Sequence, residues 1–477
     1  MRIRLQAIAI ALALAAAAPA LGQPVPPSAA SSDAVAQGRR LLDAVTGPQD
    51  DAAFLQVLHA LFPGSEMTDA QWLDARPVWR RLVFHGVGAS TATEAELQVF
   101  DPGREDWARF LVAVDPAPPH AITRFEIHGS RRPADVPAPP KLAPAALADA
   151  IRADAAEQAR QDRFSGVVLV SRHGHRIVQE AYGLADRERR RPVTLRTKLR
   201  IGSMGKMFTT IAVLQLAQAG KLDLSAPIGR YLPDFPNREI AATATVDELV
   251  NHAAGFGDFF GPEFEAHRTE LVDPRDYIAR FGARPALFPA GTAQAYSNFG
   301  YIVLGRIVEV ASGQPYDRYV ADHIFKPAGM TGSGYRPEAD PVPDRAIGYA
   351  TGPDGRLAPA TRFQVYRGTP AGGSYCTGPD LMRFADALMG GRLLDKAWLD
   401  RLLRTGVKLP NGATAFYDFA GRRDGEGRPY YGHGGAAPGQ NGVLHIFPDS
   451  GYTVVVLANR DPPGAEHLAR FIEDRLP

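Results

Sequence analysis

The chain has 477 residues, of which 45% are hydrophobic and 22% charged, and its 53 basic and 52 acidic side chains leave a formal net charge of +1. This length exceeds that of one compact core, so we expect two domains. The balanced charge excludes the basic surface of a nucleic-acid-binding protein and the polybasic patch of a membrane-surface protein.

The first residues have the pattern of a secretory signal peptide. A short basic segment precedes an apolar run over 5–18, which Pro19 ends, and small residues at 20 and 22 suit cleavage after Gly22. We therefore predict a signal peptide over 1–22 and an exported protein, periplasmic or secreted. The alternative is an uncleaved membrane anchor, but the run is short for a span. No later stretch is apolar enough to cross a bilayer, so we expect no stable membrane span after cleavage.

Residues 33–130 are predicted to form a small α+β domain. Three helical patterns extend from Asp33 to about Phe84. The hydrophobic period then changes to two, which predicts strands around 97–99, 110–114 and 122–127. The sequence indicates neither a role nor a partner for this domain. Five prolines within 131–144 predict a stiff linker after it.

Residues 145–477 are predicted to form the second domain. Helical patterns cover 146–159 and 465–476. Strand patterns occur only near the two ends of the domain, at 166–170, 177–182, 443–447 and 453–458. Strands from both ends must therefore pair around a helical middle, which predicts an antiparallel sheet flanked by helices.

The strongest chemical signal is the stretch Ile201-Gly-Ser-Met-Gly-Lys206, because a helix apolar on all sides follows it. Ser203 and Lys206 are one helical turn apart and share a face. Burial disfavours the charged form of a lysine, and a neutral amine can take the proton of a nearby hydroxyl. The amide of Ser203 lies at the helix N-terminus, which favours developing negative charge. A phosphate-binding loop is excluded, because Arg200 and Met207 occupy positions where it needs a glycine and a hydroxyl residue.

Two further segments carry candidate residues. Tyr296 and Asn298 are two positions apart before a helical pattern, so both can project to one side; the structural alternative is a loop tyrosine and a helix cap. In Gly432-His433-Gly434-Gly435-Ala436, glycines allow close approach of a backbone, and the amide of Ala436 can complete an oxyanion hole. A dinucleotide fingerprint is rejected there because a β pattern follows.

The lone cysteine, Cys376, permits no disulfide within the chain, and we expect it to be a small buried residue. The sequence has no Cys or His cluster with the spacing of a metal site. We therefore expect neither a metal nor an organic cofactor.

In this order, the three segments resemble the Ser-x-x-Lys, Tyr-x-Asn and Lys/His-Thr/Ser-Gly motifs of serine β-lactamases and penicillin-binding proteins. Because the second motif has a tyrosine and the third a histidine, the sequence most resembles the branch of class C β-lactamases and D-alanyl-D-alanine carboxypeptidases or esterases. Segments 246–256, 371–373 with 380–381, and the strand closed by Asn459 resemble the same family. The resemblance covers about 142–477 and implies a β-lactamase-like fold with an additional helical subdomain.

The resemblance implies acyl transfer with Ser203 as nucleophile, Lys206 as base and Tyr296 as proton carrier. It implies that Asn298, His433, Gly434, Gly435 and Ala436 bind the substrate and the oxyanion. Two positions depart from the family, since Gly434 and Ala254 stand where hydroxyl residues are usual. The lost hydroxyl removes a donor for a substrate carboxylate. We therefore expect a hydrolase acting on an ester or a D-amino-acid peptide, a small-molecule or short-peptide substrate. The alternatives are a β-lactamase and an inactive homologue that binds cell-wall peptides or regulates a partner.

Overall fold

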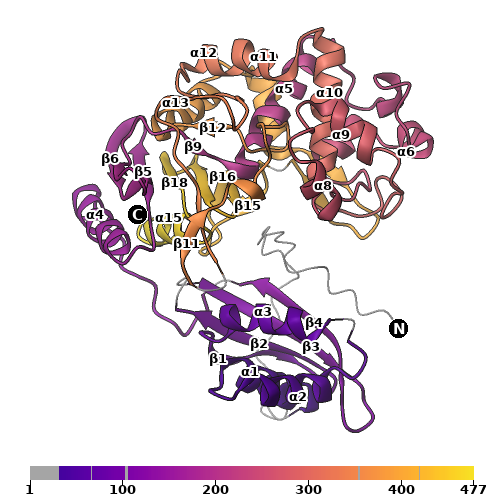
Figure 1. Cartoon of the computed structure of the whole chain (residues 1–477), viewed down its shortest axis with the longest axis vertical. Coiled ribbons are helices and arrows are strands. Elements are labelled where there is room, and N and C mark those ends of the chain that lie inside the picture. The colour runs from indigo at the N-terminus through magenta and orange to yellow at the C-terminus, as the bar shows by residue number, and fades with distance from the viewer. Residues whose placement is uncertain (1–31, 66, 103–105, 131, 353–354, 418) are drawn as a thin grey trace. The chain divides into compact units, whose positions relative to one another are not determined.

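The computed structural model of the chain describes residues 32–477, apart from 66, 103–105, 131, 353–354 and 418. The chain divides into two compact units, Met1–Ala138 and Pro139–Pro477 (Figure 1). The predicted signal peptide over 1–22 lies outside the described residues. Among the helices of the described part, none combines the length and the apolar character that a bilayer crossing requires.

The first unit is an α+β fold, in which a four-stranded antiparallel sheet of order β1-β2-β3-β4 packs against helices. Its elements are α1 (Asp33–Thr46), α2 (Asp51–Leu61), α3 (Asp69–Trp79), β1 (Val83–Ser90), β2 (Glu94–Asp101), β3 (Asp106–Val114) and β4 (Ile122–Gly129). Gly38 of α1 lies directly over Leu97 and Val112 of the sheet, where a larger side chain would collide with them. Strand β1 was not expected, because helical patterns were predicted as far as Phe84.

The second unit contains one large sheet, several two-stranded ribbons and most of the helices of the chain. Its strands are β5 (Gly166–Arg172), β6 (His175–Tyr182), β7 (Leu184–Asp186), β8 (Arg191–Pro192), β9 (Leu199–Arg200), β10 (Tyr349–Thr351), β11 (Leu357–Pro359), β12 (Tyr375–Cys376), β13 (Gly406–Lys408), β14 (Thr414–Phe416), β15 (Arg422–Arg423), β16 (Pro429–Ala437), β17 (Gln440–Phe447) and β18 (Tyr452–Ala458).

The helices of this unit cover both faces of the large sheet and form a separate helical region. They are α4 (Pro144–Arg160), α5 (Lys206–Gln218), α6 (Arg238–Thr243), α7 (Val246–Val250), α8 (Pro262–His267), α9 (Pro274–Phe281), α10 (Asn298–Ser312), α11 (Tyr316–Val320), α12 (Lys326–Ala328), α13 (Gly378–Met389), α14 (Lys396–Arg404) and α15 (Gly464–Glu473), with 3₁₀ turns over Gly202–Gly205, Ile228–Arg230 and Thr361–Phe363 and a π-helical turn over Ala321–Phe325.

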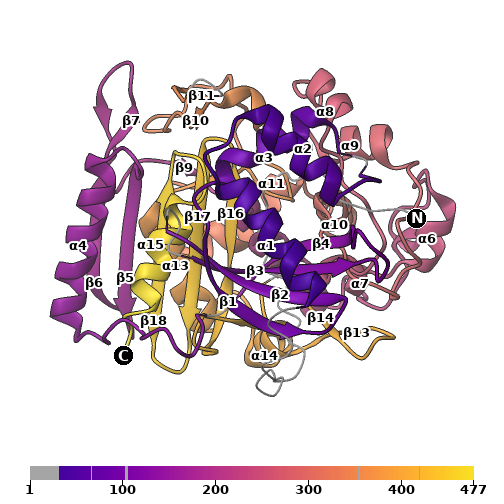
Figure 2. The same ribbon diagram turned by 90° about the horizontal axis from the view of Figure 1, so that it is seen from below.

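The large sheet joins the two ends of this unit, as predicted. Its order is β15-β16-β17-β18-β5-β6, and each neighbouring pair is antiparallel (Figure 2). β18 pairs with β5 along its whole length, from Tyr452 opposite Arg172 to Ala458 opposite Gly166. The predicted antiparallel sheet flanked by helices, with a helical subdomain, is therefore confirmed.

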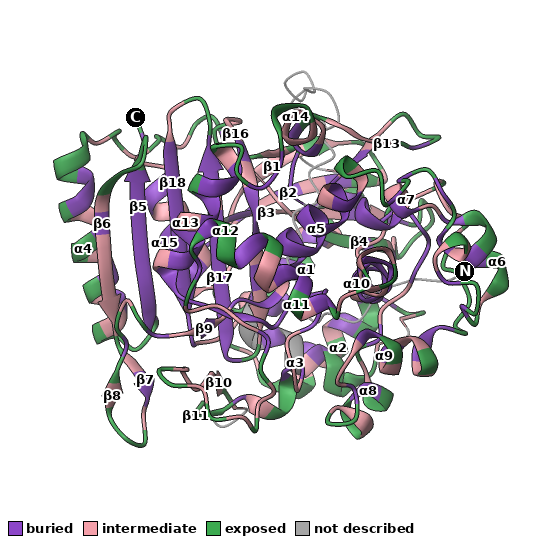
Figure 3. Cartoon of the chain, turned by 90° about the horizontal axis from the view of Figure 1, so that it is seen from above, coloured by how far each residue is buried: buried purple, intermediate pink, exposed green. Residues whose placement is uncertain are grey.

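The neighbouring strands β5 and β18 are buried on both faces (Figure 3). In β5, Val168 and Val170 pack into a core with α4 and α15, whereas Val167 and Leu169 pack into a second core with α5, α10 and α13. The sequence of a strand buried on both faces is a continuous apolar run without alternation, because each face needs its own set of apolar side chains.

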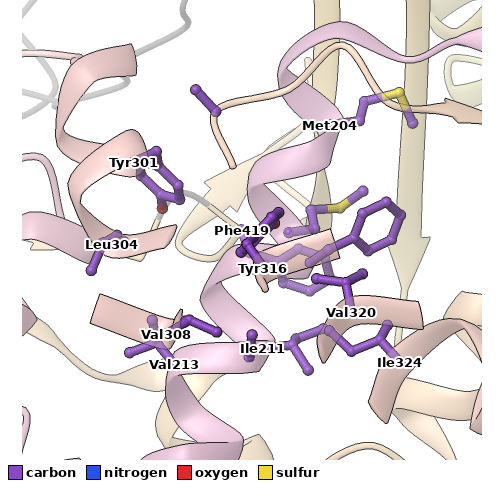
Figure 4. Packing of buried hydrophobic residues seen from close by; sticks show 14 of the residues in the cluster. Met204, Ile211, Val213, Tyr301, Leu304, Val308, Tyr316, Val320, Ile324 and Phe419 are labelled. Carbon is purple, nitrogen blue, oxygen red and sulfur yellow. The ribbon is translucent and has the colours of Figure 1, made fainter. Parts of the chain in front are cut away.

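The second core surrounds helix α5, whose first residue is Lys206. Figure 4 shows Ile211 and Val213 of α5 packed among apolar residues of α10 and α11. All the residues of α5 from Lys206 to Leu214 are buried, so the helix has no solvent-facing side over this stretch. This packing fixes the position of Lys206 at the start of the helix.

Candidate active site

Ser203 and Lys206 meet at the start of helix α5. Ser203 lies in the 3₁₀ turn Gly202–Gly205, and the side chain of Lys206 is completely buried (0% exposed). The Nζ atom of Lys206 donates to Ser203 Oγ at 3.3 Å, to Asn298 Oδ1 at 2.6 Å and to the carbonyl oxygen of Ala371 at 2.7 Å. Three acceptors therefore surround an amine that has no exposed surface.

This arrangement satisfies both protonation states of Lys206. An ammonium group has three N–H donors, one for each acceptor. A neutral amine has two N–H donors and one lone pair, so it keeps the two short bonds and directs the lone pair at the hydroxyl of Ser203. The longest of the three contacts is the one to Ser203, and it is the contact along which a proton can pass from the hydroxyl to the amine.

Tyr296 lies beside this pair, in the loop before α10. The centre of its ring is 4.6 Å from Lys206 Nζ. The ring of His252 also lies beside it, with 4.6 Å between the two ring centres. His252 Nδ1 accepts from the backbone N–H of Ser297, which ties the loop to the histidine. Ser297 is also the N-cap of α10, where its hydroxyl accepts from the amide of Gly300. The loop and the first residue of α10 thus hold Tyr296 and Asn298 next to Lys206.

The third segment reaches the nucleophile through close backbone contacts. Gly435 of β16 lies against the carbonyl group of Ile201, where any Cβ atom would collide. A Cβ atom on Gly202 would lie 3.1 Å from the amide nitrogen of Ala436. Glycine at 202 and 435 is therefore what allows strand β16 to lie beside the turn that carries Ser203.

The direction of the Ala436 amide follows from the strand pattern. The N–H of Gly432 donates to the carbonyl oxygen of Phe419, on the edge of β16 that faces away from β17. The pairing of β16 with β17 has no register shift from Tyr431 to Ala437, and successive N–H groups of a strand alternate between its two edges. The amide of Ala436 thus lies on the same edge as that of Gly432, beside the turn that carries Ser203. The amides of Ala436 and Ser203 can together hold an oxyanion.

His433 and Gly434 have a different environment. His433 is buried, and its Nδ1 contacts the carbonyl oxygen of Gly434 in the same strand. A Cβ atom on Gly434 would have no neighbour closer than 3.7 Å, so a methyl group would fit there. The structure thus brings together Ser203, Lys206, Tyr296 and Asn298, with Gly435 and Ala436 against the Ser203 turn. The contact of His433 described here is with the carbonyl oxygen of Gly434 in its own strand.

Sequence reasoning did not assign a role to two groups that touch this network. The carbonyl oxygen of Ala371 accepts from Lys206, and Gly372 lies against the backbone of Gly202 and Ser203. The carboxylate of Asp258 accepts from Asn298 Nδ2 at 2.7 Å. The two glycines of 371–373 are a sequence signal that could have indicated a close backbone approach. Asp258 had no such signal, because it lies two residues beyond the family-like segment 246–256.

Cys376 is buried, as predicted, and has no disulfide partner in the structure. Burial raises the pKa of its thiol well above the usual range. A thiol that stays protonated is a poor nucleophile. Ser203 therefore has no competitor in this cysteine.

Comparison with known proteins identifies the second unit. Residues 149–476 match the family described as Beta-lactamase. The chain is 30% identical over 296 residues to the putative penicillin-binding protein PbpX of Bacillus subtilis, covering 62% of this chain and 70% of that protein. It is 34% identical over 213 residues to the esterase EstB of Burkholderia gladioli, covering 41% of this chain and 54% of the esterase.

Among solved structures, a D-stereospecific amidohydrolase from a Streptomyces species matches with a TM-score of 0.55 and 25% identity, over 67% of this chain and 97% of that one. The first unit, up to Ala138, lies outside the residues matched by the family.

Proposed function

Since this chain belongs to the Beta-lactamase family, we propose that it is an exported serine hydrolase that cleaves esters or D-amino-acid amides through an acyl-enzyme on Ser203. The observation that carries the proposal is the contact of 3.3 Å between Ser203 Oγ and the buried Nζ of Lys206. The similarity to an esterase and to a D-stereospecific amidohydrolase supports these two substrate classes.

Acylation begins with neutral Lys206. Its lone pair takes the proton of the Ser203 hydroxyl while Oγ forms a bond to the substrate carbonyl carbon. The electron pair of the carbonyl double bond moves to its oxygen, which the amides of Ser203 and Ala436 hold. The bond to the leaving group then breaks as that group receives a proton. In our proposal, Tyr296, whose ring centre lies 4.6 Å from Lys206 Nζ, passes this proton from Lys206 to the leaving group.

Deacylation reverses these roles with water. The neutral amine of Lys206, directly or through the hydroxyl of Tyr296, takes a proton from a water molecule as the water oxygen attacks the acyl carbon. The bond from that carbon to Ser203 Oγ breaks, and Oγ recovers a proton from Lys206. The acid product leaves, and the hydroxyl and the neutral amine are restored.

Gly434 favours substrates without a carboxylate near the reacting carbonyl. The family resembled has a hydroxyl residue at this position, whereas here Gly434 has no side chain that could donate a hydrogen bond. A substrate carboxylate would lose one hydrogen bond at this position, and bonds to charged groups are among the stronger ones. Esters and amides without that carboxylate are therefore our first substrate class, and β-lactams the second.

The proposal is tested by incubating the protein with a fluorophosphonate and mapping the modified residue by mass spectrometry. We expect one adduct, on Ser203, and turnover of aryl esters or of D-aminoacyl anilides in a panel that also contains a chromogenic cephalosporin. Ser203→Ala should abolish both the adduct and turnover, while Ser225→Ala, a change at an exposed serine, should alter neither. Turnover that survives in Ser203→Ala would refute the proposal.

A further inference from the structure

The side-chain amide of Asn298 lies between the amine of Lys206 and the carboxylate of Asp258. Its Oδ1 accepts from Lys206 Nζ at 2.6 Å, and its Nδ2 donates to Asp258 Oδ2 at 2.7 Å. We infer that Asp258 is a positioning residue of the active site, which fixes the orientation of the Asn298 amide and through it the amine of Lys206. This inference rests on the hydrolase function proposed above and extends it to a residue outside the three motifs.

Asp258 itself is held firmly. Its other carboxylate oxygen, Oδ1, accepts from the amide of Phe259 at 2.7 Å, and its carbonyl oxygen accepts from Arg284 Nη1 at 2.7 Å. The preceding carbonyl, of Gly257, accepts from the hydroxyl of Ser297 at 2.7 Å. Since Ser297 is also the N-cap of α10, one side chain fixes both the start of the helix and the loop that carries Asp258.

The chemistry of an amide makes this contact directional. An amide has an acceptor at one end and two donors at the other, and a carboxylate can only accept. Turning the Asn298 amide over would place N–H groups against the amine of Lys206 and an oxygen against the carboxylate of Asp258. Both contacts would be repulsive, so Asp258 holds the amide with its oxygen towards Lys206. That oxygen in turn restrains the amine near Ser203.

The carboxylate also acts through its charge. A negative group two contacts from Lys206 favours the ammonium form over the neutral amine. The other titratable groups around the amine are Tyr296 and Tyr301, whose rings face Nζ, and His252, whose ring lies tilted against both tyrosines. Arg284 faces the loop of Asp258 through a backbone carbonyl. Removing the charge of Asp258 therefore makes Lys206 easier to deprotonate.

A double-mutant cycle on the full chain tests whether Asp258 acts through Asn298. Asp258→Ala should lower kcat/KM by about ten- to a hundredfold, as expected for the loss of a hydrogen bond to a charged group. In the background of Asn298→Ala, the same change should cost less than about twofold, since groups in one network are not additive. Equal losses in both backgrounds, or no loss in the single variant, would overturn the inference.

Asp258→Asn separates charge from hydrogen bonding, since its side-chain oxygen can still accept from Asn298. We expect the acid limb of its kcat/KM profile to move to lower pH, with KM nearly unchanged. Glu265→Gln removes one negative charge at an exposed position seven residues away in the sequence, and it should leave the pH profile unchanged. If the profile of Asp258→Asn does not move either, the electrostatic role is refuted. Fluorophosphonate labelling of the unmodified protein at Ser203 separates the two proposals, because its absence counts against the hydrolase function itself.

Discussion

The Nζ atom of Lys206 donates to the carbonyl oxygen of Ala371 at 2.7 Å. Segment 371–373 is far from α5 in the sequence, and Gly372 brings it against the backbone of Gly202 and Ser203. The amine is thus held by a backbone acceptor that no side-chain substitution removes. Because these acceptors are fixed, the buried amine of Lys206 stays close to the hydroxyl of Ser203.

Replacing the amine by an apolar group of similar length should remove catalysis but keep the fold. In Lys206→Met we expect kcat/KM to fall by about 10²–10⁴-fold, the usual contribution of a general base. The acceptors on Asn298 and Ala371 lose a donor, but a buried charged group is lost as well, so the thermal midpoint should change by less than about 5 °C. Kinetics with an aryl ester and thermal melts check both. A loss of only a few fold would show that another group deprotonates Ser203.

Gly435 and Gly434 form a matched pair for testing the oxyanion site. A methyl group at 435 collides with the carbonyl of Ile201, whereas at 434 it makes only ordinary van der Waals contacts. Gly435→Ala should therefore separate β16 from the Ser203 turn and lower kcat by about 10²-fold, comparable to the loss of one oxyanion donor. Gly434→Ala should leave kcat and the thermal midpoint nearly unchanged. Equal effects of the two substitutions would contradict the assigned role of the Ala436 amide.

Gly434→Ser should extend the substrate range. The added hydroxyl supplies a donor where the Beta-lactamase resemblance expects one, and the structure has room for the Cβ atom that carries it. We expect KM for a carboxylate-bearing cephalosporin to fall by about tenfold, the value of one charge-assisted hydrogen bond, with little change for a neutral aryl ester. Gly434→Ala serves as the control, because it adds bulk without a donor. If both variants treat the cephalosporin alike, the hydroxyl is not what limits this substrate.

Asp186 should make the stability of the second unit depend on pH in the acid range. The pKa of its carboxyl is held below the ordinary 3.8 by the backbone N–H of Arg189 at 3.0 Å and by the Arg189 guanidinium at 2.9 Å. A lowered folded-state pKa gives a stabilisation that is present above 3.8 and lost as the pH falls below it.

We therefore expect Asp186→Asn to lower the thermal midpoint by about 2 °C at neutral pH, and the difference from the unmodified chain to shrink below pH 3.8. Asp234→Asn, at an exposed carboxylate, should have no effect at either pH. Calorimetry at several pH values checks the prediction, and a difference that is constant with pH would disprove it.

The second unit was predictable because its elements carry strong local signals. β5 and β18 are apolar runs bounded by turns, and α5 is apolar on every side after a Ser-x-x-Lys pattern. By contrast, β1 has no residue that is fully buried, so its sequence shows no alternation to distinguish it from the end of a helical region. Its position depends on pairing with β2, which sequence periodicity does not record.

Parts of the site escaped prediction for a related reason. The carbonyl of Ala371 acts as a backbone group, and every residue has one, so no residue type marks it. Asp258 is one of many acidic residues, and only the path of the loop brings it to Asn298. Ser203, Lys206 and Tyr296 were detectable because their side chains carry reactive groups at a characteristic spacing.

The pairing of β18 with β5 has a consequence for biosynthesis. A ribosome makes β5 some 280 residues before its partner, so during most of translation this apolar strand has no neighbour on that side. β16, which brings the Ala436 amide to the serine, is also late. In the proposed mechanism, a nascent chain therefore carries Ser203 and Lys206 long before the Ala436 amide is made, so the proposed hydrolysis would begin only after most of the polypeptide has been synthesised.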